Sequence, residues 1–272
     1  ACTLFANTTG ASNTGVGYNA LRDNTCGTAN TALGTSSLRG NTTGSHNTAS
    51  GYATLRSNTT GLRNSAFGRS SMVNNTTGGH NTASGYYALQ SNTTAAYNTA
   101  VGTYSLHKTT TGDANTGVGY SALKANTTGS PNDAFGMNAL CTSTTGTGNV
   151  ALGYDSLRFN TNGSYNVGVG SYSSLYNTTG ASNVAVGWYA SRSNTTGYCN
   201  TAVGSRALQK NTSGACNDAF GMCTLCKNTT GSMNAAFGAA AMRGNTTGGV
   251  NVAFGRNALY NNSTASSNTA LG

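Results

Sequence analysis

Small and apolar residues recur along this chain with a strict period of 17 residues. The repeat is N-T-T-G-x-x-N-T-A-x-G-x-x-A-L-x-x, and sixteen copies account for all 272 residues without insertion or deletion. Repeats begin at Asn7, Asn24, Asn41 and every 17 residues to Asn262. Position 9 of the repeat is Ala or Gly, position 10 is usually Val, Leu or Phe, and position 15 is mostly Leu. This pattern predicts a repeat fold in which neighbouring repeats bury one another's apolar side chains.

The length of the repeat favours strands over helices. Seventeen residues are too few for two packed helices, which take about 30 or more. Residues 98–102, with the sequence N-T-A-V-G, predict a short strand, and N-T-T-G predicts a turn in which Gly takes a positive φ. We therefore predict an all-β fold, a parallel β-solenoid or β-roll of sixteen 17-residue coils with two or three short strands in each coil. Residues 1–272 are expected to form a single continuous repeat tract without caps.

Stacked coils place residues one repeat apart about 4.8 Å from one another. Position 7 is always Asn, which predicts a ladder of amide hydrogen bonds along the solenoid. Leu at position 15 and the apolar residue at position 10 are expected to form the apolar stack. The predicted ladder consists of Asn13, Asn30, Asn47, Asn64, Asn81, Asn98, Asn115, Asn132, Asn149, Asn166, Asn183, Asn200, Asn217, Asn234, Asn251 and Asn268.

Positions 8, 10 and 12 share one side of the predicted strand because side chains alternate between its two faces. Asp133, Phe135 and Met137 occupy these positions, and the same three residue types return at 218, 220 and 222. Aspartates on this side indicate that it is not a sealed interior. We expect it to be partly solvated or to face another protomer.

The string N-T-A-x-G-x-x-A-L-x-x-N-T-T-G resembles repeats of bacterial and phage fibre proteins over the whole chain. It is also similar, more distantly, to the heads of YadA-like trimeric autotransporter adhesins, whose repeat is shorter. The resemblance implies a parallel β-roll, three chains side by side, and a role in attachment or as a shaft. On these 272 residues we expect neither the coiled-coil stalk nor the membrane anchor that those adhesins carry.

The two ends of the chain are in phase with each other. The chain stops at repeat position 11 with Gly272 and starts at position 12 with Ala1. A bare terminal coil exposes unpaired strand edges. The sequence therefore predicts either a fragment of a longer tract or subunits that stack end to end.

The composition excludes several classes of function. Charged residues make up 7% of the chain, with a net charge of +9 and no stretch long enough for a membrane span. We find no Ser-His-Asp order, no paired Glu and no P-loop, and His46 and His80 lie two coils apart, too far for one metal ion. The sequence predicts a protein that is not an enzyme, has no cofactor or metal, and binds no nucleic acid.

Asparagines at position 1 form a column of N-x-S/T acceptor sites for N-glycosylation. Two interpretations stay open: a glycan column on an exposed turn, or a turn with a ladder of hydroxyl groups. The candidate glycosylation sites are Asn7, Asn41, Asn58, Asn75, Asn92, Asn126, Asn177, Asn194, Asn211, Asn228, Asn245 and Asn262.

The chain has seven cysteines, and two of them share a repeat position in consecutive coils. Cys199 and Cys216 should therefore have Cα atoms about 5 Å apart, which predicts a disulfide and an oxidising compartment. Cys223 and Cys226 form a lone C-x-x-C, which favours a bond within the coil or two buried thiols over a zinc site.

Two functional hypotheses follow from this sequence. The first is a structural extracellular fibre or filament shaft, secreted, at the cell surface or on a virion, whose partner is a further copy of itself. The alternative is an adhesin-type fibre that recognises surface glycans. Arg22, Arg39 and Arg56 form a basic stripe, which either binds an anionic glycan or is solvated and keeps filaments apart. The tyrosines at positions 12 and 13 are either sugar-stacking sites or exposed strand residues; they include Tyr18, Tyr52, Tyr86 and Tyr87. An ice-binding solenoid is disfavoured because adjacent threonines point in opposite directions.

Overall fold

A computed structural model describes residues 2–272 of the chain. The chain divides into two compact units, an N-terminal unit of Ala1–Ala134 and a C-terminal unit of Phe135–Gly272. Each unit is a parallel β-solenoid of 17-residue coils, and the described residues contain no helix. The predicted fold class is confirmed.

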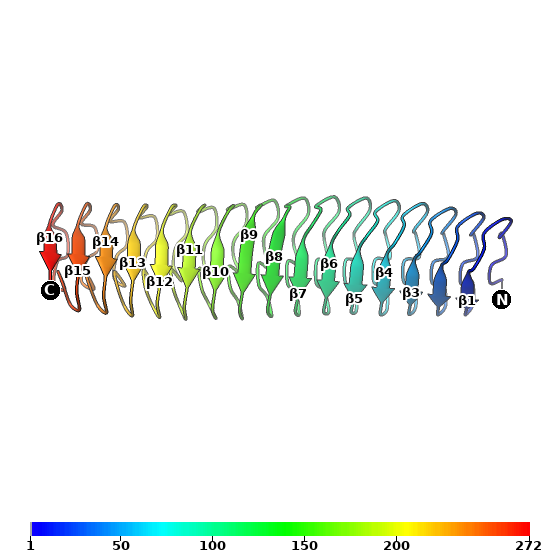
Figure 1. The fold of residues 1–272 in the computed structure, drawn as a ribbon, viewed down its shortest axis with the longest axis horizontal. Helices are drawn as coiled ribbons and strands as arrows, with labels where there is room; N and C mark the ends of the chain where they lie inside the picture. The colour runs from blue at the N-terminus through cyan, green and yellow to red at the C-terminus, as the bar shows by residue number, and fades with distance from the viewer. Residues whose placement is uncertain (1) are drawn as a thin grey trace. The chain divides into compact units, whose positions relative to one another are not determined.

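In the N-terminal unit, each coil contributes one strand, and each strand pairs in parallel with the next (Figure 1). The register is one repeat, so that Thr14 pairs with Thr31. The strands are β1 (Thr14–Val16), β2 (Thr31–Leu33), β3 (Thr48–Ser50), β4 (Ser65–Phe67), β5 (Thr82–Ser84), β6 (Thr99–Val101) and β7 (Thr116–Val118). Strand β8 (Asn132–Phe135) lies at the division between the units.

The C-terminal unit repeats the same arrangement with the same register, Val167 pairing with Val184. Consecutive strands again pair in parallel. The strands are β9 (Asn149–Leu152), β10 (Val167–Val169), β11 (Val184–Val186), β12 (Thr201–Val203), β13 (Asp218–Phe220), β14 (Ala235–Phe237), β15 (Val252–Phe254) and β16 (Thr269–Leu271).

One strand per coil replaces the two or three that the sequence predicted. Turns form the remaining sides, and they still hydrogen-bond from coil to coil: the amide of Thr25 donates to the carbonyl of Thr42 at 2.9 Å, and the amide of Leu21 donates to that of Ser37 at 3.1 Å. Residues at positions 6, 13 and 15 have positive φ in nearly every coil, as at Leu38 with φ 47°, and Pro131 at position 6 is an exception. A positive φ is unfavourable for residues other than Gly. The backbone leaves the strand conformation at these positions, and the coil bends there.

Glycine is favoured at two positions for different reasons. At position 11, Gly102 has φ 126°, and a Cβ there would lie 2.6 Å from the carbonyl oxygen of Gly119 in the next coil. At position 4, no positive φ occurs, contrary to the prediction for N-T-T-G. A Cβ on Gly44 would instead lie 2.4 Å from both the Asn41 Oδ1 and the Gly61 carbonyl oxygen.

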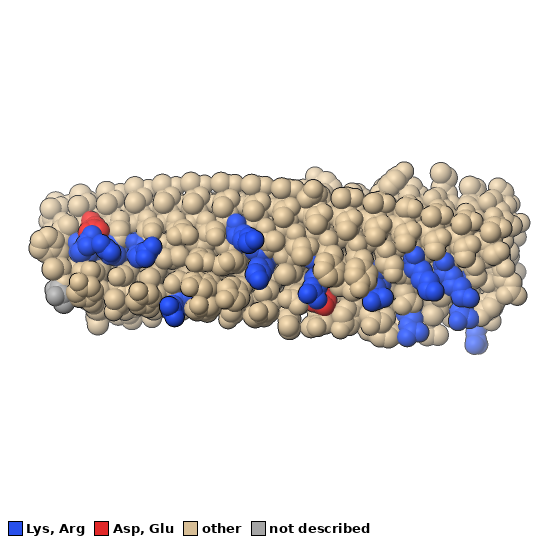
Figure 2. All heavy atoms as spheres, turned by 180° about the vertical axis from the view of Figure 1, so that it is seen from behind, with Lys and Arg blue, Asp and Glu red and all other residues tan. Residues whose placement is uncertain are grey.

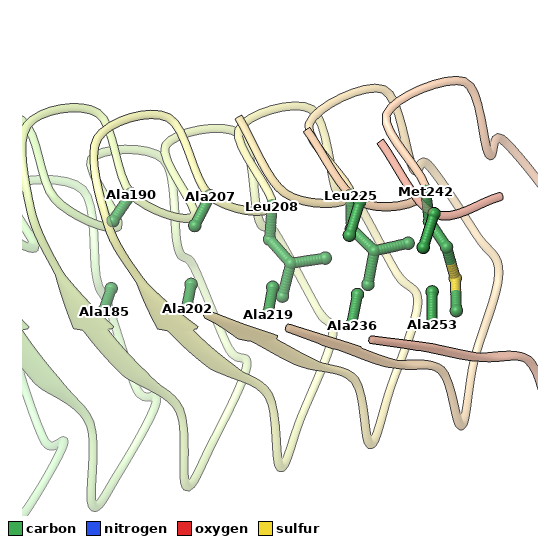
Figure 3. Close-up of a cluster of buried hydrophobic side chains, with 12 residues drawn as sticks. Ala185, Ala190, Ala202, Ala207, Leu208, Ala219, Leu225, Ala236, Met242 and Ala253 are labelled. Atoms are coloured by element: carbon green, nitrogen blue, oxygen red, sulfur yellow. The ribbon is translucent and has the colours of Figure 1, made fainter. Parts of the chain in front are cut away.

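The interior of each coil is filled by positions 9, 14 and 15. Figure 3 shows the alanines of strands in the C-terminal unit facing the opposite wall, Ala202 toward Ala207 and Ala219 toward Leu208. Leu side chains at position 15, among them Leu89 and Leu208, are fully buried. A buried Leu contributes about 1.5–3 kcal/mol, and the small residues opposite leave room for it.

Position 10 points outward, so the prediction that it joins the apolar stack is wrong. Strand residues alternate between faces, and the buried residue at position 9 turns positions 8 and 10 toward solvent. Phe67 is 43% exposed and Leu152 49% exposed. The expectation that the side with positions 8, 10 and 12 is not sealed agrees with this geometry.

Asparagines at position 7 form a buried ladder in each unit. The side-chain amide of Asn47 donates to Asn30 Oδ1 at 3.2 Å and to the Gly61 carbonyl at 2.9 Å. Asn30 Oδ1 also accepts from the backbone amide of Asn47 at 3.0 Å. The side chain therefore ties its own coil to the coils before and after it.

Candidate functional site

No group of three or more His, Cys or Asp side chains that could hold a metal ion occurs among residues 2–272. His80 stacks on the ring of Tyr97 at a centroid distance of 5.0 Å. His107 is half-buried, with Nδ1 at 3.3 Å from the Tyr87 carbonyl oxygen, and burial lowers the pKa of its imidazole. Across the described part of the chain, no helix is long and apolar enough to cross a membrane.

Asparagines at position 1 form a second ladder, which the sequence analysis did not predict. The side-chain amide of Asn41 donates to Asn24 Oδ1 at 2.8 Å and to the carbonyl of Gly44 in its own turn at 2.8 Å. Both amide hydrogens are used, and the side chain is fully buried. The expectation that position 1 lies on an exposed turn is wrong.

This burial argues against glycans at most of the candidate acceptor sites. A glycan would replace an amide hydrogen of the ladder and would have no room in the folded coil. The buried candidate sites are Asn41, Asn58, Asn75, Asn92, Asn126, Asn177, Asn194, Asn211, Asn228 and Asn245. Asn7 is exposed and Asn262 half-buried, so glycosylation stays a prediction at these two.

The cysteines are all free thiols in the described structure. Cys199 and Cys216 are exposed and unbridged. A disulfide needs Cβ atoms about 3.8 Å apart, closer than the spacing of about 4.8 Å between stacked coils. The predicted bridge rested on the Cα separation alone. Burial, followed by the neighbouring Cys223, raises the pKa of Cys226, while hydrogen bonds from Thr9 and Thr25 lower the pKa of Cys26.

Aromatic and basic side chains at positions 12, 13 and 16 form what we call the aromatic–basic surface. In the N-terminal unit the Tyr104 ring meets the Tyr120 ring edge to face at 6.3 Å, and Lys124 Nζ lies 5.3 Å from the Tyr104 ring centroid. Figure 2 shows Lys and Arg side chains along each unit, on the side seen from behind. Rings and cations thus lie on one exposed surface.

The C-terminal unit carries an aromatic–basic surface of the same kind. Trp188 stacks on Tyr189 at 4.1 Å, and the guanidinium of Arg192 lies 5.0 Å from the Tyr189 ring centroid. Phe159 and Tyr176, at position 17, stack at 5.5 Å and line a shallow apolar groove beside it. Exposed rings flanked by cations are suited to ligands that combine flat apolar faces with acidic groups.

A second exposed surface is the outer face of the sheet, which carries positions 8 and 10. In the C-terminal unit Phe220, Phe237 and Phe254 stack in consecutive coils at 5.0 Å and 4.7 Å with nearly parallel rings. Positions 7–11 contain no Lys or Arg in any repeat. The phenylalanine stack makes this sheet face apolar at position 10 in the C-terminal unit, and the face lacks Lys and Arg throughout, although Asp133 and Asp218 lie on it at position 8.

No protein-family model, curated protein or solved structure matches this chain. The candidate functions therefore depend on the two surfaces and on the stacked fold that carries them.

Proposed function

We propose that this protein is a structural element of an extracellular fibre, a shaft of stacked β-coils whose role is mechanical rather than catalytic. The proposal is supported by the uniform coil-to-coil bonding within each unit. The coils repeat the one-repeat register of the sheet and the amide ladder at position 7, and the second amide ladder at position 1 is interrupted only at Thr109 and Ser143. Such bonds act in series along a solenoid, so that load on one coil passes to the next.

Electron microscopy of the purified full chain tests this proposal. We expect narrow rods or filaments of uniform width. A Gly102→Ala variant, whose added Cβ would clash with the next coil, should give fewer intact rods at the same concentration. Compact globular particles from the unaltered chain would contradict the fibre role.

We also propose that the fibre associates laterally with further copies through the apolar sheet face. The support is the exposed phenylalanine stack at position 10 and the absence of Lys and Arg from positions 7–11. Replacing Phe220, Phe237 and Phe254 by Ser, the residue found at position 10 in Ser50 and Ser84, should lower the mass measured by sedimentation equilibrium. An unchanged mass would exclude this face as the contact.

A second candidate function is glycan binding, as in an adhesin displayed outside the cell. It is favoured by the aromatic–basic surface, where Tyr18, Tyr52 and Tyr120 are 49–59% exposed. Binding to a glycan array with the full chain, with loss of binding in Tyr-to-Thr variants, would support this role.

A further inference from the structure

Aromatic residues occupy position 12 in alternate repeats from Tyr18 to Trp188. Over this stretch the pattern has a period of 34 residues, twice the repeat length, and it ends with Met222 and Arg256 at the next two alternate repeats. The aromatic residues are Tyr18, Tyr52, Tyr86 and Tyr120 in the N-terminal unit and Tyr154 and Trp188 in the C-terminal unit, while Thr35, Arg69, Thr103 and Ser171 occupy the repeats between them within each unit. Within a unit, the rings at position 12 are therefore about 9.5 Å apart along the solenoid, and rings at position 13, such as Tyr104 and Tyr172, lie in coils between them.

Ring size does not require this alternation. Phe220, Phe237 and Phe254 occupy position 10 in three consecutive coils, with their rings stacked in parallel at 5.0 Å and 4.7 Å. Coil spacing therefore accommodates an exposed aromatic ring in every coil. The two-coil interval between aromatic residues at position 12 therefore needs an explanation other than ring size.

Over the same stretch, basic residues at position 16 follow this period with two exceptions, Arg39 in an intervening repeat and Gln90 in the repeat of Tyr86. Five of the six repeats with an aromatic residue at position 12 have Lys or Arg at position 16, and only the repeat of Tyr86 has Gln90 instead. The pairs are Tyr18 with Arg22, Tyr52 with Arg56, Tyr120 with Lys124, Tyr154 with Arg158, and Trp188 with Arg192. Intervening repeats mostly carry uncharged residues at position 16, such as Val73 and Leu175. The two-coil period therefore includes one ring and one cation.

Most of these cations have no carboxylate partner. Among the described residues, the ion pairs are Arg22 with Asp23 at 2.7 Å and Arg158 with Asp155 at 3.1 Å. Arg56, Lys124 and Arg192 form none, and Arg192 lies over the ring of Tyr189 at 5.0 Å. A ligand with acidic groups would supply the missing counter-charges beside the rings.

We infer that the aromatic–basic surface binds an extended acidic polysaccharide with a two-sugar repeat. Aromatic rings pack against the C–H faces of pyranose rings, and an extended β-linked chain presents the same sugar face at every second residue. One sugar of each pair would stack on the ring at position 12, and the acidic group of the pair would meet the cation at position 16. A two-coil spacing of about 9.5 Å is close to the length of two sugars in such a chain.

Other ligand classes account for less of this pattern. A neutral polysaccharide would leave the cations unused, and a flexible polyanion without sugar rings would leave the aromatic residues unused. A single-stranded nucleic acid uses both, but its bases follow one another at about 3.4 Å when stacked, which does not match a two-coil period. The inference rests on the glycan-binding candidate function and is independent of the fibre role.

Binding of the full chain to hyaluronan, an alternating polymer of uronate and N-acetylhexosamine, tests the inference. Its carboxyl-reduced form is the matched neutral control, because the sugar backbone is unchanged. We expect the full chain to bind hyaluronan at least about tenfold more tightly than the reduced polymer in low salt, with affinity falling as salt is added.

Three variants separate the contributions of ring, cation and spacing. Tyr18, Tyr52 and Tyr120 replaced together by Thr should weaken binding by roughly tenfold or more, and Arg56→Gln with Lys124→Gln should remove the preference for the acidic polymer. Both substitutions copy residues that other repeats hold at the same positions, Thr35 and Gln90. Tyr52→Thr combined with Thr35→Tyr keeps the number of rings but breaks their spacing, and it should also weaken binding.

Thr60→Ser serves as the control, since Thr60 is exposed at position 3, outside both the aromatic–basic surface and the sheet face, and Ser213 holds the same repeat position; it should leave hyaluronan binding unchanged. Equal binding of the acidic and reduced polymers, equal binding of polyphosphate or of a single-stranded oligonucleotide, or full binding by the respaced variant would overturn the inference while leaving a fibre role intact. Failure to bind any of a panel of neutral and acidic polysaccharides would overturn glycan binding itself.

Discussion

At the residue scale, this solenoid relies on asparagine side chains that form hydrogen bonds between coils, as backbone amides do. Asn47 donates to an oxygen of the preceding coil and to the carbonyl of Gly61, and its own Oδ1 accepts from the Asn64 amide at 3.0 Å. A buried polar group that loses its partner destabilises a protein far more than an exposed one. The invariance of Asn at position 7 therefore has a stability cause.

Asn47→Asp should strongly destabilise the chain. The new carboxylate places an oxygen where the amide donated to Asn30 Oδ1 and the Gly61 carbonyl, so two attractive contacts become repulsive. We expect the free energy of unfolding to fall by about 3 kcal/mol or more, measured by guanidinium denaturation. Thr60→Ser, at an exposed position, is the control and should change little. Equal stability of the two variants would mean that the ladder contributes nothing.

His107 should make the stability depend on pH. Burial lowers its pKa below the ordinary value of 6.5, and Lys124 and Lys108 act in the same direction. The unfolded chain therefore binds this proton at higher pH than the folded chain. The contribution of neutral His107 to the free energy of unfolding is complete above pH 6.5. It is lost as the pH falls toward and through the lower pKa of the folded state.

Denaturation midpoints measured between neutral and mildly acidic pH test this dependence. His107→Gln, which copies Gln90 and Gln209 at the same repeat position, should lose part of the acid-induced decrease that the unaltered chain shows. Parallel pH profiles for the two proteins would rule out His107 as the source.

At the scale of the coil, one short strand is sufficient because the turns also bond to their neighbours. Each coil bends at residues with positive φ, at positions 6, 11, 13 and 15. An isolated turn of this kind is unfavourable by about 1–2 kcal/mol per non-glycine residue. Coil-to-coil hydrogen bonds such as Leu21 to Ser37 hold these bends in place, so no coil is expected to be stable alone.

One coil of the N-terminal unit shows how closely positions 1 and 4 depend on each other. Ala95 replaces the usual Gly at position 4, and Thr109 replaces the Asn that would follow at position 1 of the next coil. Asn92 Oδ1 and Thr109 Oγ1 are buried without a hydrogen-bond partner. In other coils a Cβ at position 4 would lie 2.8 Å from the side-chain amide nitrogen of the next position-1 Asn, as at Gly44. Ala95 therefore leaves no room for an Asn at position 109.

Ala95→Gly combined with Thr109→Asn should stabilise the protein, while either substitution alone should not. Thr109→Asn alone meets the methyl group of Ala95, and Ala95→Gly alone leaves the orphaned oxygens. We expect the double variant to gain about 1–2 kcal/mol over the sum of the single changes, because it restores buried hydrogen bonds. A double-mutant cycle by chemical denaturation measures this coupling, and simple additivity would refute it.

At the scale of the whole molecule, stability is expected to depend on nearest-neighbour stacking. Within each unit the register between strands is always one repeat. A complete coil can therefore be added or removed without changing the contacts between the other coils. The number of coils in a unit then sets its length without changing its local structure.

Deleting residues 41–57, one full repeat, should leave the fold intact. The deletion joins Gly40 to Asn58 and keeps both asparagine ladders in phase. We expect the β signal in circular dichroism to persist and the melting temperature to stay within about 5 °C. Deleting residues 41–49 removes an incomplete coil and should lower the melting temperature far more. Similar melting by the two deletions would argue against the stacked-coil account.

Several features were predictable because they depend on the period alone. A 17-residue repeat with invariant Asn at position 7 and Gly at position 11 leads to parallel coils, an amide ladder and a tight turn. The aromatic alternation at position 12 was also present in the sequence as a 34-residue period. Individual tyrosines do not reveal this alternation, because it lies in their spacing alone.

The orientation of each side chain depended on the tertiary structure. The sequence determined the period, the strand-forming segment and the column in which each residue stands, because identical neighbours must stack in register. The tertiary structure decided which columns face inward. Position 10 is apolar yet exposed, as at Phe254, whereas Asn41 is polar yet buried. The path of the turns sets these directions, and side-chain polarity alone does not encode that path.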